Sequence, residues 1–231
     1  MAKRIGIIGG ISHASTIKYY EFILKKYFAR NRNYHYPEVV ILSLDLAKLV
    51  GFEERGDIDG YIRYLTTGIK SLEKAEAEFI LIAANSPHAV FDILQKKASV
   101  PLLSIVEITA LEAKRLKMKK LLLIGIKHTM QSPFYRDVFA KHGMEVITPL
   151  EEEQEEINKI IFKELVLGIY KNATRNKLLD IINSYDEDGV ILGCTELSLA
   201  INQEDTKIKL LNTLELHALA ALDYSLKEGS V

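Results

Sequence analysis

The sequence predicts an α/β fold with two pseudo-symmetric, Rossmann-like lobes, each built on an open parallel sheet covered by helices. Two observations support this fold class. Short runs rich in aliphatic residues alternate with longer helical patterns along the 231 residues, and this alternation is typical of doubly wound sheets. In addition, two segments of the first half resemble two segments of the second half, which indicates that one α/β unit is repeated in the chain.

Near-continuous apolar runs suit parallel strands that are buried on both faces. We predict strands at Arg4–Ile8, Glu38–Leu44, Glu78–Ala83, Lys120–Ile124, Met144–Thr148 and Gly189–Leu192. Helical patterns occur at Ser15–Arg30, Asp57–Ala75, Pro87–Lys97, Ile105–Leu116, Ser132–His142, Glu151–Leu167 and Thr174–Tyr185. We place one lobe at residues 1–103 plus 212–231 and the other at residues 104–211, joined by short crossings near Val100–Ile105 and Leu210–Leu214.

The internal repeat involves the first and third predicted strands of each lobe with the turns that follow them. The similar pairs are residues 3–10 with 119–126 and residues 79–86 with 189–196. The two turns are 75 positions apart in one copy (84 − 9) and 69 in the other (194 − 125). Chance similarity between hydrophobic strands is the alternative explanation. Because ligands of open α/β sheets bind beyond the carboxyl ends of the strands, a duplication would pair Ala84 with Cys194 across a cleft between the lobes.

The composition argues against several classes of function. A formal net charge of −1 provides no overall field to attract nucleic acid or an anionic membrane. No apolar run reaches the roughly 18 residues that suggest a membrane helix. The single cysteine cannot form an intramolecular disulfide, and the N-terminus lacks a cleavable signal pattern. We therefore expect a cytoplasmic protein that binds neither nucleic acid nor membrane.

Small and polar residues follow the predicted strands of the first lobe. The segment Gly9–Ser12 does not have the glycine spacing of a dinucleotide-binding turn. Its backbone N–H groups at the start of a helix could hold a carboxylate, and Ser12 or Ser15 could equally cap that helix. Asn85 and Ser86 after the third strand offer neutral donors for a carboxylate, or serve as turn and cap residues.

Cys194 follows a strand and precedes a helix. Helix N-termini lower the pKa of a thiol from its ordinary value of about 8.5, and a thiol with a near-neutral pKa exchanges protons readily. The alternative is an inert, buried cysteine. His217 likewise either approaches the cleft from the last helix or is a capping or core histidine. His88 is expected to pack behind the site rather than act as a base.

Together these segments resemble the aspartate/glutamate racemase family, in its aspartate racemase branch. The resemblance spans the chain and rests on Gly9–Ser12 with Thr16 and Tyr19-Tyr20, Asn85–His88, Leu123–Tyr135, Gly193–Glu196 and Thr213–Ala218. It implies racemisation of a small acidic amino acid, aspartate or glutamate, by two cysteines on opposite sides of Cα that act as base and acid. It also implies that no cofactor is used, neither pyridoxal phosphate nor metal, and that the protein is a homodimer.

The resemblance makes Cys194 the base or acid of the second lobe. It assigns the α-carboxylate and amino group of the substrate to Asn85, Ser86 and Thr195, since oriented amides and hydroxyls stabilise developing charge. The side-chain carboxylate is assigned to Ser12, Thr16 and Thr129, with Arg55 or Lys163, and the predicted substrate-binding set is completed by Glu196 and His217.

Ala84 is the main departure from the family. It occupies the position of the first catalytic cysteine, which is a threonine in some L-specific relatives. A methyl group cannot transfer a proton, so Cys194 alone would exchange the α-hydrogen of one enantiomer, by analogy the L form, without inversion. Either Ala84 replaces a native cysteine in an engineered variant, or the chain is a natural single-thiol relative. Glu53 and Glu54 replace the Gln or Arg of relatives, which leaves the binding of the distal carboxylate open.

Two other functions fit the same residues. One is a single-cysteine decarboxylase or isomerase of the same superfamily. Such a decarboxylase needs an apolar pocket for the departing carboxylate, and the turns rich in Ser, Thr and Asn argue against one. The other is a non-catalytic dicarboxylate binder, in which Cys194 has no chemical role.

Overall fold

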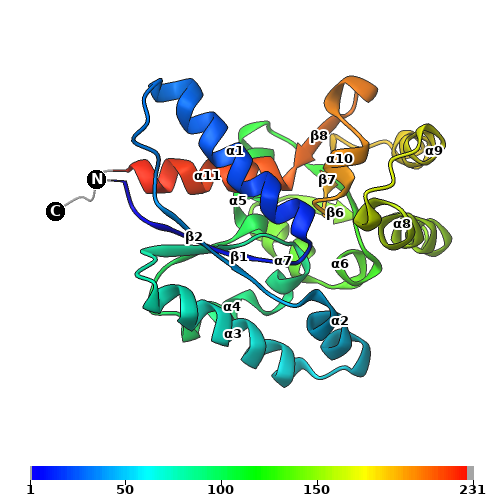
Figure 1. Cartoon of the computed structure of the whole chain (residues 1–231). Coiled ribbons are helices and arrows are strands. Elements are labelled where there is room, and N and C mark those ends of the chain that lie inside the picture. The colour runs from blue at the N-terminus through cyan, green and yellow to red at the C-terminus, as the bar shows by residue number, and fades with distance from the viewer. Residues whose placement is uncertain (1, 228–231) are drawn as a thin grey trace. The chain divides into compact units, whose positions relative to one another are not determined.

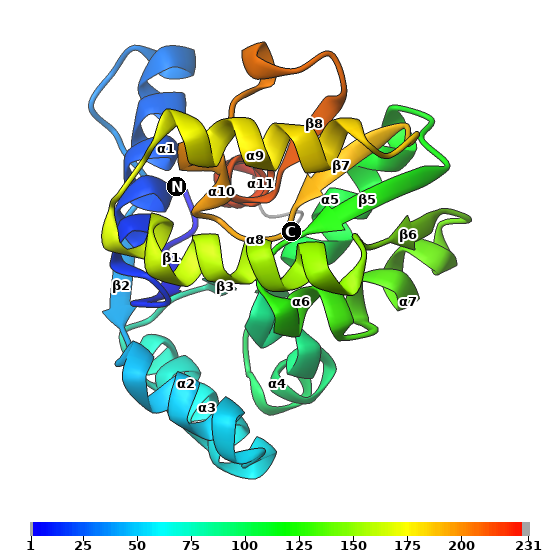
Figure 2. The same cartoon turned by 90° about the vertical axis from the view of Figure 1, so that its right-hand side faces the viewer.

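The computed structural model describes residues 2–227, which divide into two compact units. Unit 1 comprises the described residues up to Ser104 and from His217 onward, and unit 2 comprises Ile105–Leu216. Each unit contains a four-stranded sheet in which all neighbouring strands are parallel. Helices flank both sheets (Figures 1 and 2). The predicted fold class is confirmed.

Unit 1 has the strand order β2-β1-β3-β4. Its strands are β1 (Ile5–Gly9), β2 (Val39–Ser43), β3 (Phe79–Ile82) and β4 (Leu102–Leu103). Its helices are α1 (His13–Asn31), α2 (Leu46–Arg55), α3 (Ile58–Lys74), the 3₁₀ segment η1 (Ser86–Val90), α4 (Phe91–Lys97) and the larger part of α11 (Thr213–Leu226). Ile8 lies opposite Ile82 in the register of the sheet. The turns after β1 and β3 are therefore neighbours at the carboxyl ends of the strands.

Unit 2 has the equivalent order β6-β5-β7-β8. Its strands are β5 (Lys120–Ile124), β6 (Glu145–Ile147), β7 (Gly189–Leu192) and β8 (Lys209–Asn212). Its helices are α5 (Ile105–Arg115), α6 (Lys127–Gln131), α7 (Phe134–Lys141), α8 (Glu151–Lys163), η2 (Leu165–Leu167), α9 (Asn172–Asn183), α10 (Leu197–Ala200) and η3 (Gln203–Asp205). Ile124 lies opposite Leu192, as Ile8 lies opposite Ile82 in unit 1. The same order and register in both sheets agree with the internal repeat.

Helix α3 illustrates how the sequence builds these layers. Its buried residues Tyr61, Leu65, Ile69 and Leu72 recur every three or four positions, so one face of the helix covers the sheet core. Each fully buried aliphatic side chain contributes about 1.5–3 kcal/mol of hydrophobic stabilisation. The side chain of Asp57 caps the first turn by accepting a backbone hydrogen bond. The apolar face thus directs the start of α3, including Tyr61, toward the sheet.

All six predicted strands are confirmed to within one residue at each end. Two short strands were not predicted: β4 and β8 lie where we expected simple crossings. β4 has only two residues, directly after Pro101, and β8 begins at the exposed Lys209. Neither presents an apolar run long enough to predict a strand, and both are identified by pairing with a neighbour.

The helix predictions differ from the structure mainly around glycine and proline. The predicted helix Ser132–His142 begins only at Phe134, with Pro133 at its N-terminal boundary, and α6 is a separate helix before it. Proline lacks a backbone N–H and is tolerated at a helix start. Helix α2 was not predicted, and Gly51 in its middle weakens the helical pattern. Within residues 2–227, no helix is both long and apolar enough to cross a membrane.

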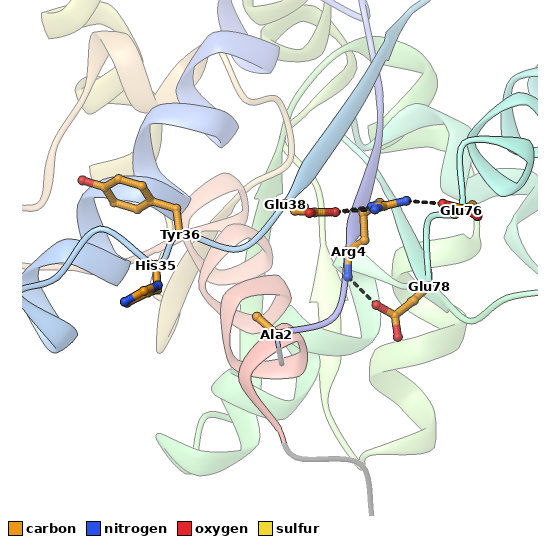
Figure 3. A pocket seen from close by; sticks show the side chains of 7 residues that line it. All are labelled: Ala2, Arg4, His35, Tyr36, Glu38, Glu76 and Glu78. Atoms are coloured by element: carbon orange, nitrogen blue, oxygen red, sulfur yellow. Dashed lines mark hydrogen bonds and ion pairs between the residues drawn. The ribbon is translucent and has the colours of Figure 1, made fainter.

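A surface cavity of about 650 Å³ lies at the amino ends of β1 and β3 in unit 1, away from the turns that follow these strands (Figure 3). Arg4 extends between two carboxylates there, with Nη2 2.5 Å from Glu38 and Nη1 2.8 Å from Glu76. The backbone N–H of Arg4 also donates to Glu78 over 2.6 Å. None of the predicted site residues lines this cavity.

Candidate active site

The first turn of unit 1 is held by its own hydroxyl groups. The Thr16 hydroxyl donates to the carbonyl of Ser12 over 2.8 Å and accepts from the N–H of Gly10 over 2.9 Å. Ser12 caps α1 and accepts a hydrogen bond from the N–H of Ser15. Gly10 has a φ of +82°, and a Cβ there would lie 2.2 Å from the carbonyl oxygen of Leu44, so the turn requires glycine. Ser12 therefore does cap the helix, and its predicted contact with substrate stays a prediction.

The second turn of unit 1 follows β3 directly. The N–H of Ala84 donates to the carbonyl of Ile82 over 2.8 Å, which turns the backbone sharply at the end of the strand. Ala84 and Asn85 are each 4% exposed. Ser86 begins η1 and is hydrogen bonded to the hydroxyl of Tyr61, a residue of α3. The turn thus presents a methyl, an amide and a hydroxyl in close succession.

Two buried histidines support this turn from inside unit 1. His217 lies 3.0 Å from the carbonyl of Leu103 through Nε2 and 2.9 Å from the Tyr19 hydroxyl through Nδ1. Because a carbonyl only accepts, Nε2 donates to Leu103 and Nδ1 accepts from Tyr19. His88 crosses His217 edge to face, with ring centroids 6.0 Å apart. Burial lowers the pKa of His88 to about 4 and that of His217 to about 3, so both rings are neutral near pH 7.

Thr129 occupies the first turn of unit 2, on α6. It is fully buried, and its hydroxyl makes no hydrogen bond to any residue between positions 2 and 227. Its methyl group lies close to the backbone of Gly193, since a Cβ at that glycine would be 3.4 Å from it. Buried hydroxyls normally have a partner, so Thr129 has an unused donor beside the end of β7.

Cys194 stands at the second turn of unit 2 and touches an acid. Its thiol donates to Oε2 of Glu196 over 3.0 Å, and the hydroxyl of Thr195 donates to the same oxygen over 3.0 Å. Glu196 is only 4% exposed. The turn therefore directs a thiol and a hydroxyl at one oxygen of a buried acid.

The predicted near-neutral thiol is wrong. Burial, followed by the negative charge of Glu196, raises the pKa of the Cys194 thiol well above its ordinary value. The backbone N–H groups of Glu196 and Leu197 act in the opposite direction but do not outweigh these two effects. Helix α10 has only four residues, too few to build up a strong dipole.

Comparison with known proteins identifies the family of the chain. The family described as Asp/Glu/Hydantoin racemase matches residues 8–221. The chain belongs to this family. The resemblance read from the strand-end segments is thereby confirmed.

Three relatives of the chain extend over most of its length. A Yersinia pestis structure provisionally described as an Asp/Glu racemase is 35% identical, with a TM-score of 0.89, and covers 97% of this chain and 100% of its own. An aspartate racemase homologue from Pyrococcus horikoshii OT3 is 38% identical, with a TM-score of 0.85, and covers 97% and 99%. The broad specificity amino-acid racemase RacX of Bacillus subtilis (strain 168) is 26% identical over 90% of this chain and 92% of its own.

Two site predictions for this racemase-family chain fall on exposed side chains. Arg55 ends α2, and its guanidinium lies 5.5 Å above the ring of Phe52. Lys163 is exposed at the last residue of α8. Within residues 2–227, no group of three or more His, Cys, Asp or Glu side chains could hold a metal ion.

Tyr61 is the site neighbour that the sequence did not reveal. Its hydroxyl contacts both Ser86 and Glu53, although it lies more than twenty positions before the turn. The available signal was a tyrosine on the otherwise apolar face of α3, where a hydroxyl needs a buried partner. Tyr19 beside His217 gives a similar signal within α1.

Proposed function

We propose that this racemase-family enzyme exchanges the α-hydrogen of aspartate or glutamate with solvent through Cys194, and that Ala84 prevents it from completing inversion. The contact of 3.0 Å between the thiol of Cys194 and the carboxylate of Glu196 carries the proposal. It places a proton acceptor against the sulfur in the turn to which the resemblance assigns the second catalytic cysteine.

The proton path follows from the high pKa of the thiol. Cys194 rests as a thiol, so Glu196 takes the sulfur proton to make a thiolate when substrate is bound. The thiolate removes hydrogen from Cα, and the electron pair stays on the substrate as a carbanion. The new thiol exchanges its proton with solvent through Glu196 and returns a solvent hydrogen to the same face. Proton transfer by a placed side chain contributes typically about 10²–10⁴ in rate.

Neutral donors are proposed to hold the substrate. The amide of Asn85 and the hydroxyl of Thr129 are assigned to carboxylate groups of the substrate, because each can donate and neither adds a competing charge. The unused donor of Thr129 supports its assignment. Thr195 is committed to Glu196 through its hydrogen, so we assign it to holding that acid in place.

Deuterium exchange tests the proposal. The protein is incubated in heavy water with L- or D-aspartate, and separately with each enantiomer of glutamate. We expect deuterium at Cα in one enantiomer, the L form by analogy, with retention of configuration. Ala84→Cys should add racemisation, because a second thiol can then serve the opposite face. If Ala84→Cys inverts neither aspartate nor glutamate, the proposal is wrong.

A non-catalytic dicarboxylate binder is the second candidate, and the raised pKa of Cys194 favours it. It predicts stabilisation by aspartate that Cys194→Ser leaves unchanged, with no deuterium at Cα. We further propose a homodimer, supported by the family resemblance and tested by light scattering of the purified chain.

A further inference from the structure

Helix α1 exposes an apolar stripe beside the outer strand of the unit 1 sheet. Ile17, Tyr20 and Phe28 lie on one face of the helix and are 61%, 44% and 45% exposed. The ring of Phe28 stacks on that of Tyr34, with centroids 6.4 Å apart, and Tyr34 is 84% exposed. Ile41 of β2 is 39% exposed. We call these five residues the α1 patch.

The members of the α1 patch share one face of the sheet. Figure 1 shows α1 and α3 on opposite faces of the unit 1 sheet. Leu42 points toward α3, since a Cβ at Gly68 of that helix would lie 3.4 Å from its side chain. Side chains alternate along a strand, so Ile41 points to the α1 face. Tyr27 of α1 contacts Tyr36 in the segment that leads into β2, with ring centroids 5.5 Å apart, so this side of the helix adjoins the β2 edge.

The outer side of β2 presents backbone groups to which another strand can pair. β2 is an outer strand of its sheet, and within residues 2–227 it pairs with β1 alone. The N–H of Leu44 donates to the carbonyl of Gly9 over 2.9 Å. Backbone groups alternate in direction along a strand, so the even-numbered residues bond to β1. Val39, Ile41 and Ser43 therefore direct their N–H and C=O groups outward.

The repeated unit shows that the fold does not require such an edge. The equivalent strand β6 has three residues and begins with the charged Glu145, and short length and charge both discourage pairing at an edge. Helix α7, which leads into β6 as α1 leads into β2, exposes Arg136, Asp137 and Lys141. β2 has five residues and none is charged. Unit 1 thus lacks the protection that unit 2 has.

We propose that the β2 edge and the α1 patch bind a second copy of this chain, with the two β2 strands antiparallel and Ile41 at the two-fold axis. This inference rests on the proposed homodimer and locates its interface. Val39 of each copy then faces Ser43 of the other, so all three outward residues form hydrogen-bonded pairs. No like charges meet between the strands, because β2 has none. Both α1 helices lie on the same face of the joined sheet, which brings the two patches together.

The exposed area is large enough for a dimer of this kind. A half-exposed side chain of this size offers roughly 100 Å², so the α1 patch presents roughly 500 Å² of side-chain surface. Contiguous apolar areas above a few hundred Å² are uncommon on monomers and mark interaction sites. A standard interface buries about 800 Å² on each partner. The backbone edge of β2 and the polar flanks of α1 supply the difference.

A pair of opposite charges at position 41 tests the interface. Sedimentation equilibrium of the full chain gives the dissociation constant of the dimer. Ile41→Glu and Ile41→Lys should each raise it about 100-fold, because both copies lose an apolar contact and like charges meet at the axis. An equimolar mixture of the two variants should dimerise again, since opposite charges then face each other. Phe162→Glu is the matched control, a 41% exposed residue of α8 in unit 2, and should leave the constant unchanged.

Hydrogen exchange of the unmodified chain gives a second measurement that needs no variant. Peptides from β2 should gain protection as the protein concentration rises, because the outward N–H groups become paired, whereas peptides from β6 should not. Equal behaviour of β2 and β6 would overturn the interface.

The outcomes separate this inference from the proposed function. A monomeric unmodified chain overturns both the interface and the proposed homodimer, and leaves the proposal of exchange at Cα untouched. If both Ile41 variants dimerise as tightly as the unmodified chain, the interface is wrong and the homodimer stands. If both are monomeric and their mixture stays monomeric, the antiparallel pairing at Ile41 is wrong.

Discussion

The turns after β3 and β7 follow strands at equivalent places in the two sheets and differ in their chemistry. Ala84 and Cys194 each lie two residues beyond a matched position of the sheet, at Ile82 and Leu192. The unit 1 turn continues with neutral groups and is backed by neutral histidines, whereas the unit 2 turn places a thiol against the carboxylate of Glu196. The repeat therefore determines where a reacting atom can stand. The side chains around it determine which unit can move a proton.

Moving the thiol from one turn to the other gives the largest expected effect. The double variant Ala84→Cys/Cys194→Ala should exchange the α-hydrogen of the opposite enantiomer, the D form by the same analogy. It should react at least about 10²-fold more slowly than the unmodified chain, because position 86 holds serine where position 196 holds a carboxylate. Cα deuteration of both enantiomers, followed by NMR, measures this. Cys194→Ala alone is the control and should show no exchange above background.

If the double variant exchanged the α-hydrogen of the same enantiomer as the unmodified chain, this comparison of the two turns would be contradicted. Position 84 would then not serve the face of the substrate opposite Cys194. An exchange rate equal to that of the unmodified chain would instead show that the acid beside the sulfur has no role.

Glu196→Gln separates the two effects of that acid on Cys194. Exchange at Cα should fall about 10²-fold because the thiol proton has lost its acceptor. The pKa of the thiol should fall toward its ordinary value, since the negative charge that raises it is gone. The pH dependence of alkylation reports this pKa directly, because the chain has one cysteine. Glu204→Gln, an exposed acid of η3, should change neither quantity. A rise in the thiol pKa would contradict the electrostatic account.

The buried histidines predict that acid weakens unit 1 more than unit 2. His88 and His217 have folded-state pKa values of about 4 and about 3, below the ordinary 6.5. Below pH 6.5 the unfolded chain therefore binds protons that the folded chain does not bind. The free energy of unfolding falls as the pH decreases toward 4. At about pH 5 the loss is about 2 kcal/mol for each histidine.

Hydrogen exchange resolved by segment can locate this loss. Peptides from β3, β4 and α11 should lose protection between about pH 7 and pH 5 before peptides from β5 and β7 do. In unit 2, His142 is only partly buried and lies 2.7 Å from a carboxylate of Glu107. Equal loss of protection in both units would contradict the prediction.

The fold was predictable because its strands are continuous apolar runs. The internal repeat also places Ala84 and Cys194 at equivalent strand ends, as the registers of β3 and β7 do. The strands β4 and β8 were not predicted because pairing with a neighbouring strand, rather than local sequence, defines them. The site was less predictable for a similar reason. The direction of the thiol pKa shift depends on where the side chain of Glu196 turns, and the hydroxyl partner of Ser86 comes from Tyr61 on another helix.

The smallest expected effect compares the amino ends of the two sheets, where Arg4 directly precedes β1 and Lys120 begins β5. Arg4 pairs with Glu38 and Glu76, whose side chains are 68% and 82% exposed. Lys120 pairs over 3.0 Å with Glu187, whose side chain is 3% exposed. Because water solvates an exposed carboxylate but not a buried one, Lys120→Met should lower the urea midpoint more than Arg4→Met. High salt should remove the effect of Arg4→Met and leave most of that of Lys120→Met. If Arg4→Met lowered the urea midpoint more than Lys120→Met, burial of Glu187 would not determine how much these ion pairs contribute to stability.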